Sequence, residues 1–394
     1  MTAIDVVILA GSRTPQGRVN GQLASLTAVQ LGTAAITGAL ARAGVAPDQV
    51  DAVLMGQVLQ AGAGQNPARQ SAVAAGIPWN VPAMTLNKVC LSGLAAIIDA
   101  ARLVRLGEAD VVIAGGQESM TNAPHLLPGS RHGWAYGTVP MLDHAAHDGL
   151  TDAFDGLSMG LSTELANEKL GLTRLQQDDV AAASHQRTAA AVSADVFDEE
   201  ITPLSVPQRK GEPLVLTTDE GVRAASTTET LGRLRPAFSK DGNITAGNAA
   251  PLSDGASAVV VTSKAWAEAH GLSWLAVIEA SGQVAGPDNS LHSQPANAIA
   301  SALTKQGWDA NDLDVLEINE AFASVVVQSS KVLGVSADKV NIHGGGIAIG
   351  HPIGASGARV ALHAALELSR RGTGKAAVAL CGGGGQGEAL LLSR

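Results

Sequence analysis

The same order of predicted strands and helices occurs near both ends of this 394-residue chain, and this recurrence constrains the fold more than any other feature. Apolar runs and amphipathic stretches alternate in the first third, with strands expected at 4–9, 50–56, 83–86 and 111–114 and helices at 27–43, 65–75 and about 91–105. The last third repeats the order, with helices at 298–306 and 355–370 and strands at 313–318, 340–343 and 376–380. Such alternation predicts mixed, mostly parallel sheets with helices on both faces. Two half-chains of one α/β design are expected, each with an almost enclosed helix, at 91–105 and 355–370, that packs on its counterpart.

The middle of the chain breaks the pattern. Residues 121–248 contain seven prolines, one clear amphipathic helix near 176–192 and little strand signal. We therefore expect an N-terminal half made of residues 1–120 with 251–271, an inserted loop domain at 121–250, and a C-terminal half at 272–394. Insertions of this size usually cover a site or form a subunit contact.

Composition limits the kinds of partner and compartment. The formal net charge is −10 without any basic run, which argues against nucleic acid or an anionic membrane surface as the main partner. No apolar stretch is long enough to cross a bilayer, and the first residues lead directly into an apolar run without a basic leader. Two cysteines far apart in sequence cannot form a disulfide framework. A cytoplasmic protein is the expectation.

Four polar or reactive positions stand at the ends of predicted strands or the starts of predicted helices. Cys90 begins the apolar helix of the first half, and Asn319, His351 and Cys381 occupy such positions in the second half. Carboxyl ends of parallel strands converge on one crevice, so these side chains could meet there. Each has a simpler explanation when taken alone: a buried small hydrophobe for Cys90, a helix cap for Asn319, a turn residue for His351.

Two other chemistries are poorly supported by the glycine and cysteine patterns. The four glycines at 382–385 are not followed by Lys-Ser/Thr, and Gly372-Thr373-Gly374-Lys375 precedes a strand, so neither stretch is a Walker-type phosphate loop. No Cys or His pair has the spacing of zinc ligands. We expect no metal and no cofactor.

Taken together, the motifs resemble those of the thiolase family. The resemblance rests on Asn-Lys-Val-Cys-Leu-Ser-Gly at 87–93, Asn-Glu-Ala-Phe at 319–322, Gly-His-Pro-Ile-Gly-Ala-Ser-Gly-Ala-Arg at 350–359 and Cys-Gly-Gly-Gly-Gly-Gln-Gly at 381–387, with further matches at 115–120 and 234–238. It covers nearly the whole chain. It implies a five-layered α-β-α-β-α fold, formed by two repeated half-domains plus an inserted loop domain.

The resemblance also implies a role for each reactive residue. Cys90 would be the nucleophile that takes an acyl group from a CoA thioester, and His351 would accept its proton. Cys381 would be the second acid–base group. His351 and a water held by Asn319 would stabilise the enolate, and the backbone N–H groups of Cys90 and Gly383 would form the second oxyanion site. Both cysteines lie where backbone N–H groups favour the thiolate, so we expect both pKa values to be low.

The CoA contacts are likewise implied by the resemblance. The pantetheine arm and nucleotide would be contacted by Leu150, Met159, Arg223, Phe238, Ala246, Ala250, Ala321 and Phe322. Two positions depart from acetyl-CoA-specific relatives, which commonly have His where this chain has Ser158 and Ser where it has Ala250. Each change removes a possible polar contact to the pantetheine.

The expected reaction is the reversible joining of two acetyl-CoA molecules into acetoacetyl-CoA and CoA. Gly149–Phe154 resembles the short-chain group of thiolases and favours the acetyl substrate. A degradative 3-ketoacyl-CoA thiolase of broader chain length is the alternative, and a non-catalytic acyl-CoA or lipid carrier is a remote one. A ketoacyl synthase would carry a second His where this chain has Cys381. We expect a homodimer or homotetramer, with part of the insertion near 124–142 forming the tetramer contact.

Overall fold

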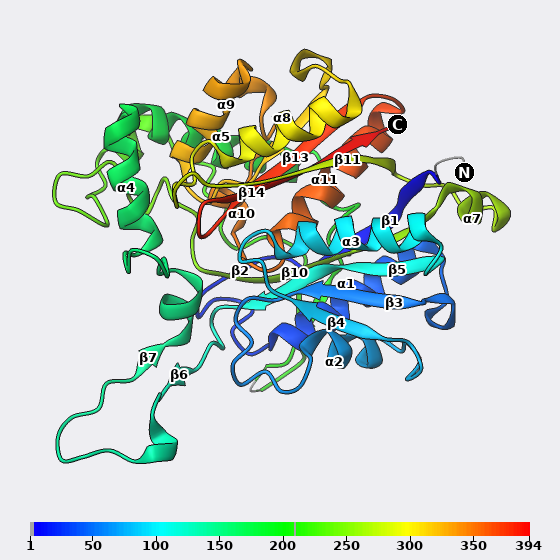
Figure 1. Ribbon diagram of the computed structural model, residues 1–394, viewed down its shortest axis with the longest axis horizontal. Helices are drawn as coiled ribbons and strands as arrows, with labels where there is room; N and C mark the ends of the chain where they lie inside the picture. Colours follow the sequence, from blue (N-terminus) through cyan, green and yellow to red (C-terminus); the bar gives the residue numbers. More distant parts are fainter. Residues whose placement is uncertain (1–3, 209) are drawn as a thin grey trace.

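The computed structural model describes residues 4–208 and 210–394 of the chain (Figure 1). Its strands are β1 (Val6–Arg13), β2 (Gly17–Arg18), β3 (Ala52–Gly56), β4 (Ala83–Leu86), β5 (Val111–Ser119), β6 (His125–Leu126), β7 (Leu142–Asp143), β8 (Leu204–Val206), β9 (Leu214–Leu216), β10 (Ser253–Ser263), β11 (Ala276–Ala285), β12 (Val315–Ile318), β13 (Lys375–Gly382) and β14 (Gln386–Ser393).

The α-helices are α1 (Ala28–Ala43), α2 (Pro67–Ala74), α3 (Ser92–Leu106), α4 (Met159–Leu170), α5 (Arg174–Ser193), α6 (Thr228–Gly232), α7 (Lys264–Ala269), α8 (Gln294–Gln306), α9 (Ala323–Leu333), α10 (Gly346–Ile349) and α11 (Ser356–Arg371). Short 3₁₀ turns cover Pro47–Gln49, Ser130–His132, Ala310–Asp312 and Ala337–Lys339, and a π-helical turn covers Ala145–Gly149. Within the described residues, no helix has both the length and the apolar character that a membrane crossing requires.

Ten strands form one continuous sheet in the order β12-β13-β14-β11-β1-β10-β5-β3-β4, with β2 paired to β10. The two halves are joined at the start of β1, where Val6, Val7 and Ile8 pair with both β10 and β11. The mixed α/β class is confirmed, and parallel pairing is confined to the two ends of the sheet, at β3–β4, β3–β5 and β12–β13. The pairs between them are antiparallel, and in one of them, β13–β14, the short turn at 383–385 reverses the chain.

The side-chain alternation of the strands creates five layers. Val6 and Ile8 face a central layer that contains α3 and α11, whereas Val7 and Leu9 face α1 and α2. In the other half, Val378 faces the central layer and the neighbouring alanines of β13 face α8. Figure 1 shows the succession: α8 and α9 above, one half of the sheet, α3 and α11, the other half of the sheet, and α1 and α2 below. The expected α-β-α-β-α arrangement is present.

Two glycines allow the central helices to approach closely. A Cβ added to Gly93 in α3 would lie 2.8 Å from the backbone N of Ala358, and one added to Gly357 in α11 would lie 2.3 Å from the backbone N of Leu94. Only a residue without a Cβ permits such backbone contact. The expected packing of the two enclosed helices is therefore confirmed, and it brings the loops that precede them together.

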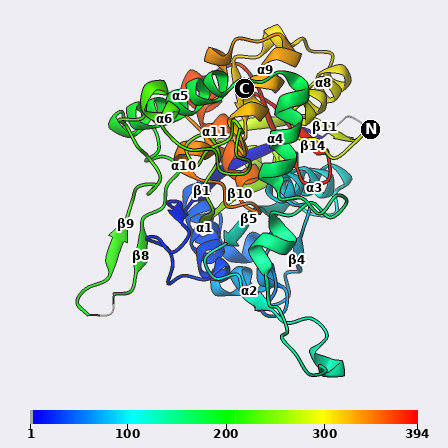
Figure 2. The same cartoon turned by 90° about the vertical axis from the view of Figure 1, so that its left-hand side faces the viewer.

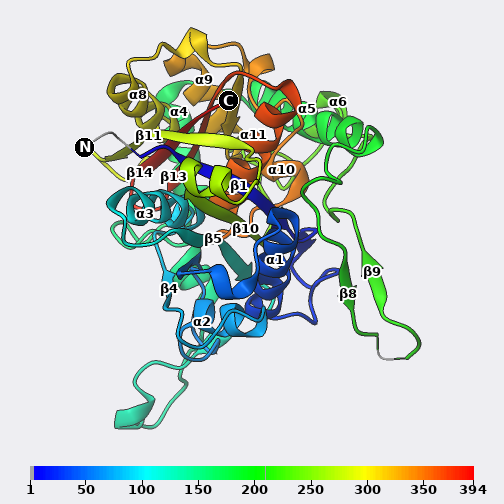
Figure 3. The same cartoon turned by 90° about the vertical axis from the view of Figure 1, so that its right-hand side faces the viewer.

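The insertion is more ordered than its sequence indicates. The expected helix near 176–192 is α5, and α4 and α6 accompany it. Two hairpins, β6–β7 and β8–β9, project from the body in different directions (Figures 2 and 3). The expected strand at 340–343 is wrong: Val340 forms only an isolated bridge to Leu316, because Asn341 adopts a left-handed conformation with φ 53° and turns the chain.

Candidate active site

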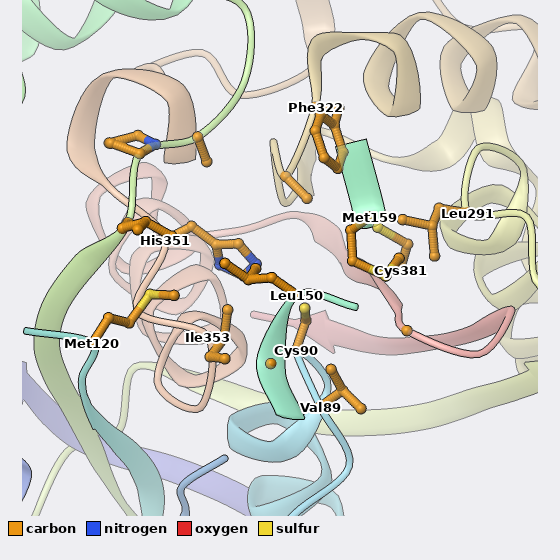
Figure 4. A pocket seen from close by; sticks show the side chains of 16 residues that line it. Val89, Cys90, Met120, Leu150, Met159, Leu291, Phe322, His351, Ile353 and Cys381 are labelled. Carbon is orange, nitrogen blue, oxygen red and sulfur yellow. The ribbon is translucent and has the colours of Figure 1, made fainter. Parts of the chain in front are cut away.

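An apolar pocket lies where the two halves meet and contains about 560 Å³ of empty space, part of which is open to solvent. Cys90, His351, Cys381 and the backbone at Gly383 line it together (Figure 4). The rest of the lining is mostly apolar and includes Val89, Met120, Leu150, Met159, Leu252, Leu291, Phe322 and Ile353. Side chains that are nearly 300 positions apart thus meet around one cavity.

A short turn holds Cys90 between β4 and α3. Val89 has a positive φ of 51°, unusual for a β-branched residue, and its N–H donates to Asn87 Oδ1 at 2.9 Å. Ser92, the first residue of α3, donates from Oγ to Val89 O at 2.6 Å and accepts from the backbone N of Lys88 at 2.8 Å. These bonds fix the turn and direct the thiol into the pocket.

Burial has the largest effect on the pKa values of both thiols, Cys90 and Cys381. It raises the pKa of Cys90 to about 12, although the backbone N–H groups of Cys90 and Gly383 act in the opposite direction; negative charge on Glu118 adds to the rise. Burial also raises the pKa of Cys381, and the nearby Cys90 adds to it. The expectation of two low thiol pKa values is therefore wrong for the unliganded protein, since the apolar lining penalises the thiolate more than the N–H groups favour it.

Cys381 is the penultimate residue of β13, which ends at Gly382 before the tight turn to β14. Gly384 and Gly385 in this turn have positive φ values of 76° and 68°, and a Cβ on Gly385 would lie 1.9 Å from Asp288 O. Gly383 differs, because a Cβ there would make an ordinary 3.4 Å contact with Val89. The turn thus requires glycine at 385 on steric grounds.

His351 lies in the segment between α10 and α11 and is buried. Its Nδ1 lies 2.6 Å from Ser356 Oγ, and the Ser356 hydroxyl also donates to Pro352 O at 3.0 Å. With that hydroxyl hydrogen committed to Pro352, we assign the ring proton to Nδ1, which leaves Nε2 as the acceptor. Burial, with a smaller contribution from the Arg359 cation, lowers the pKa of His351 to about 3. The imidazole is neutral at pH 7 and able to accept a proton.

Asn319 follows β12 and lies against the imidazole, outside the pocket lining. Its Nδ2 is 3.4 Å from both ring nitrogens of His351. Its backbone N–H donates to Ala379 O, which fixes its position beside β13. The amide Oδ1 is buried and has no hydrogen-bond partner among the described atoms.

Comparisons with known proteins agree with this geometry. Residues 6–265 match the thiolase N-terminal domain, and residues 272–394 match the thiolase C-terminal domain. This chain belongs to the thiolase family. It is 58% identical to a probable acetyl-CoA acetyltransferase of Mycolicibacterium smegmatis over 98% of this chain and 100% of that protein. It is 51% identical to the acetyl-CoA acetyltransferase of Pseudomonas aeruginosa, over 99% of each chain. The crystal structure of the Bacillus anthracis acetyl-CoA acetyltransferase superimposes with a TM-score of 0.96 at 38% identity, over 99% of each chain.

The predicted CoA contacts of this thiolase fall into two groups. Leu150, Met159, Ala250, Ala321 and Phe322 line the pocket.

The other three predicted contacts lie outside the lining. Arg223 and Ala246 are exposed, and Phe238 contacts the ring of Phe322 edge-on at 6.4 Å between centroids. The hydroxyl of Ser158 accepts the N–H of Leu161 as the N-cap of α4, so it serves the helix. The chemical roles assigned to these residues remain predictions.

Sequence reasoning missed two buried carboxylates that position the reactive loops of the thiolase. Glu118, at the end of β5, accepts the backbone N–H groups of Val58, Leu59 and Gly354 and so ties the first half to the His351 loop. Burial raises its pKa to about 7.

Glu320 is the second of these carboxylates. It accepts from Ser184, Asn341 and the N–H of Ile347 and thereby holds α10. The available signal was an acidic residue near the C-terminal end of an apolar strand in each case, inside β5 for Glu118 and two residues after β12 for Glu320. Among residues 4–208 and 210–394, no group of three His, Cys, Asp or Glu side chains is arranged to hold a metal ion.

Proposed function

We propose that this thiolase is an acetyl-CoA C-acetyltransferase, which converts two acetyl-CoA molecules into acetoacetyl-CoA and CoA in a reversible reaction. The convergence of Cys90, His351 and Cys381 on one apolar pocket carries the proposal. The names of the M. smegmatis and P. aeruginosa relatives support the acetyl substrate.

In the first half-reaction, His351 Nε2 takes the proton of Cys90 as Sγ attacks the thioester carbonyl of acetyl-CoA. A pre-formed thiolate is not needed, because the proton moves during the attack. The tetrahedral intermediate collapses, the C–S bond to CoA breaks, and CoA leaves with the proton from His351. The product is acetyl-Cys90.

In the second half-reaction, the Cys381 thiol passes its proton to His351, which lines the same pocket, and the resulting thiolate removes a proton from the methyl group of a second acetyl-CoA. Proximity to Cys90 and burial disfavour a standing thiolate at Cys381, so acetylation of Cys90, which removes its ionisable proton, makes the second deprotonation easier. The enolate carbon attacks the acetyl carbonyl, the bond to Cys90 Sγ breaks, His351 returns its proton to that sulfur, and acetoacetyl-CoA is released.

Negative charge develops on a thioester oxygen in both half-reactions. The backbone N–H groups of Cys90 and Gly383 already face Sγ of Cys90, so they are suitable donors to the oxyanion formed on the acyl group at that sulfur. His351, with Asn319 against its ring, is placed to stabilise the enolate oxygen. Such donors, fixed before the reaction, typically contribute about 3 kcal/mol each to the barrier reduction.

The test compares thiolysis of acetoacetyl-CoA and of 3-ketohexanoyl-CoA, each with CoA, by loss of the ketoacyl thioester. An acetyl-specific enzyme consumes the first much faster than the second. A broader 3-ketoacyl-CoA thiolase is the second candidate, favoured by Ala250 in the lining and by the engagement of Ser158 as a helix cap. Equal rates would replace the first proposal by the second. No thioester loss with either substrate would refute both.

We also propose a homodimer or homotetramer in the cytoplasm. Strand β4 is the last in the sheet order, and half-exposed Met84 lies on it, so it could pair with a second copy. The β6–β7 hairpin carries the exposed side chains Trp134, Tyr136 and Met141, which favours a further contact. Light scattering coupled to gel filtration distinguishes monomer, dimer and tetramer.

A further inference from the structure

The polar stripe of α11 is unusual because the helix lies inside the central layer. It consists of Arg359, His363, Glu367 and Arg370, which lie on one side of an otherwise apolar helix. At the surface end, Glu367 accepts from Arg370 at 2.6 Å and from Arg371 at 2.8 Å. This end of the stripe is an ordinary ion-pair network.

The middle of the stripe is buried and fully paired. His363 Nδ1 lies 2.9 Å from Glu200, and its Nε2 lies 3.1 Å from His343 Nδ1. Glu200 also accepts from Arg13 at 2.7 Å, and Arg13 forms a bidentate pair with Asp219. Every charge in this part of the stripe has a direct partner.

The inner end of the stripe does not follow this rule. Arg359 is 1% exposed, and its Nε has no hydrogen-bond partner among the described atoms. Glu317 is also 1% exposed, and neither of its carboxylate oxygens has one. Buried charges without partners are costly, so ordered water between a guanidinium and a carboxylate is the physical solution for this end of the stripe.

This inner end lies close enough to the His351 imidazole for the Arg359 cation to lower its pKa. Glu317 is two residues before Asn319, so both side chains lie on the side of β12 that carries Val315, which packs in the central layer with α11. Arg359 comes about one helical turn after Ser356, whose Oγ holds His351 Nδ1. The unpartnered Oδ1 of Asn319 is suited to the same water.

We propose that Glu317 and Arg359 form a water-bridged charge pair that sets the proton affinity of His351, which makes both of them positioning residues. The proposal rests on the proposed role of His351 as the acceptor of the Cys90 proton. The Arg359 cation opposes formation of an imidazolium, and the Glu317 anion offsets that opposition. The charge of Glu317 therefore decides how readily His351 takes the proton.

The pair gives this effect a pH dependence. Burial raises the pKa of Glu317 to about 7; His363 and Arg359 lower it, and Glu320 and Glu200 raise it. Burial also lowers the pKa of Arg359, against the opposing effect of Glu317, but the guanidinium stays charged near pH 7. Below pH 7 Glu317 is protonated and the field of Arg359 is uncompensated, so His351 is the weaker base. Glu118 titrates in the same range with the opposite sign, because its anion disfavours the Cys90 thiolate.

The experiment measures alkylation of Cys90 by iodoacetamide between pH 5.5 and 8.5 (about 1.5 units on either side of the Glu317 pKa), quantified on the Cys90 peptide by mass spectrometry. No acyl substrate is needed, so failure of the proposed substrate specificity leaves this test intact. The matched control is Glu367→Gln, a charge removal at the surface end of the same stripe. Because the pKa of Cys90 lies above this range, the alkylation rate of every form rises with pH, so the proteins are compared at the same pH. The wild type and this control should show an additional step of about tenfold near pH 7, the change produced by one unit in the pKa of His351.

Two variants with opposite expected effects decide the proposal. Glu317→Gln should match the wild type below pH 7 and be about tenfold slower than it above pH 7, and Arg359→Met should be about tenfold faster than the wild type below pH 7 and match it above. Glu317→Asp and Arg359→Lys keep the charges, so they should keep the rise near pH 7 even if they unfold at lower temperature. If Glu317→Gln keeps the wild-type profile, or if both charge-removing variants change the rate in the same direction, the pair is structural only and the proposal is wrong.

Discussion

Helices α3 and α11 begin alike and differ along their length. Each starts with Ser-Gly, at 92–93 and 356–357, each serine holds a reactive loop, and each glycine allows the other helix to approach. The polar side chains of α3 then turn to solvent, with Asp99 and Arg102 at 40% and 51% side-chain exposure. Those of α11 remain largely inside the protein. The shared start builds the site, whereas the continuation of α3 carries its polar side chains to solvent and that of α11 forms a buried charge network.

The largest difference between the halves should appear when either sulfur is removed. Cys90→Ala should abolish acetyl-enzyme formation, with at least roughly a thousandfold loss of thiolysis, because no nucleophile remains. Cys381→Ala should still become acetylated at Cys90 but lose condensation. Intact-protein mass spectrometry after mixing with acetyl-CoA distinguishes them. Normal condensation by Cys381→Ala would remove the role we assign to that thiol.

The crossing of the helices predicts the next largest effect. Gly357→Ala should lower the free energy of unfolding by about 1–3 kcal/mol and displace both reactive loops, because its methyl group would meet the Leu94 backbone. Gly93→Ala should cost less, since its added carbon would lie farther from the backbone of the other helix. Gly232→Ala is the control, with nothing within 4 Å of the added carbon. Urea unfolding should give this order; equal midpoints for all three would contradict the close packing.

The serines that begin α3 and α11, Ser92 and Ser356, should differ in what they contribute to the site. Ser356→Ala removes the acceptor for His351 Nδ1–H, so kcat should fall about tenfold with little change in KM, the cost of about one hydrogen bond to the reacting group. Ser92→Ala removes the bonds to Val89 and Lys88 that fix the Cys90 turn. It should therefore slow iodoacetamide alkylation of Cys90 while Ser356→Ala acts mainly on kcat. Steady-state thiolysis and alkylation rates provide both measurements, and identical profiles for the two variants would show that the serines are not specialised.

The smallest expected effect is a change in folding stability at acidic pH. Burial lowers the pKa of His292 and His343 to about 4 and that of His351 to about 3. Their stabilising contribution is complete above about pH 6.5, the unfolded value, and is lost as the pH falls toward 4, because the unfolded state then binds protons that the folded state excludes. Glu317 offsets part of this loss, since its pKa is raised to about 7 and it favours the folded state as the pH falls.

The first half contains no histidine before residue 121, and its Glu118, with a raised pKa, also gains stability as the pH falls. Lowering the pH from about 7 to about 5 should therefore increase amide hydrogen exchange in α8 and α11, after correction for intrinsic rates, and leave β3 and β5 protected. Equal loss of protection in both halves would contradict the unequal distribution of buried histidine.

Many of the helices and strands, and most of the residues that meet at the pocket, could be predicted from local sequence. Thr27 and Gly44, which cap α1, could be identified because capping depends on adjacent residues. Cys90, His351 and Cys381 could be placed at one crevice because strand ends converge, and Gly383 followed from the resemblance to the thiolases. The antiparallel centre of the sheet could not be predicted, since strand β14 follows a turn of only three residues whose glycines fit a functional loop equally well.

Properties that depend on packing were the hardest to predict. The raised thiol pKa values arise from the apolar lining contributed by distant residues such as Met120 and Leu291. The exposed positions of Arg223 and Ala246 depend on how the insertion folds over the pocket. Neither a motif nor a periodic pattern contains that information.

The shared central layer means that the catalytic pocket is a seam between the two halves. A half produced alone would present the apolar face of α3 or α11 to water and would lack either Cys90 or His351. Separately produced halves would therefore be inert, and recovery of turnover on mixing them would report their association, as in a split reporter enzyme.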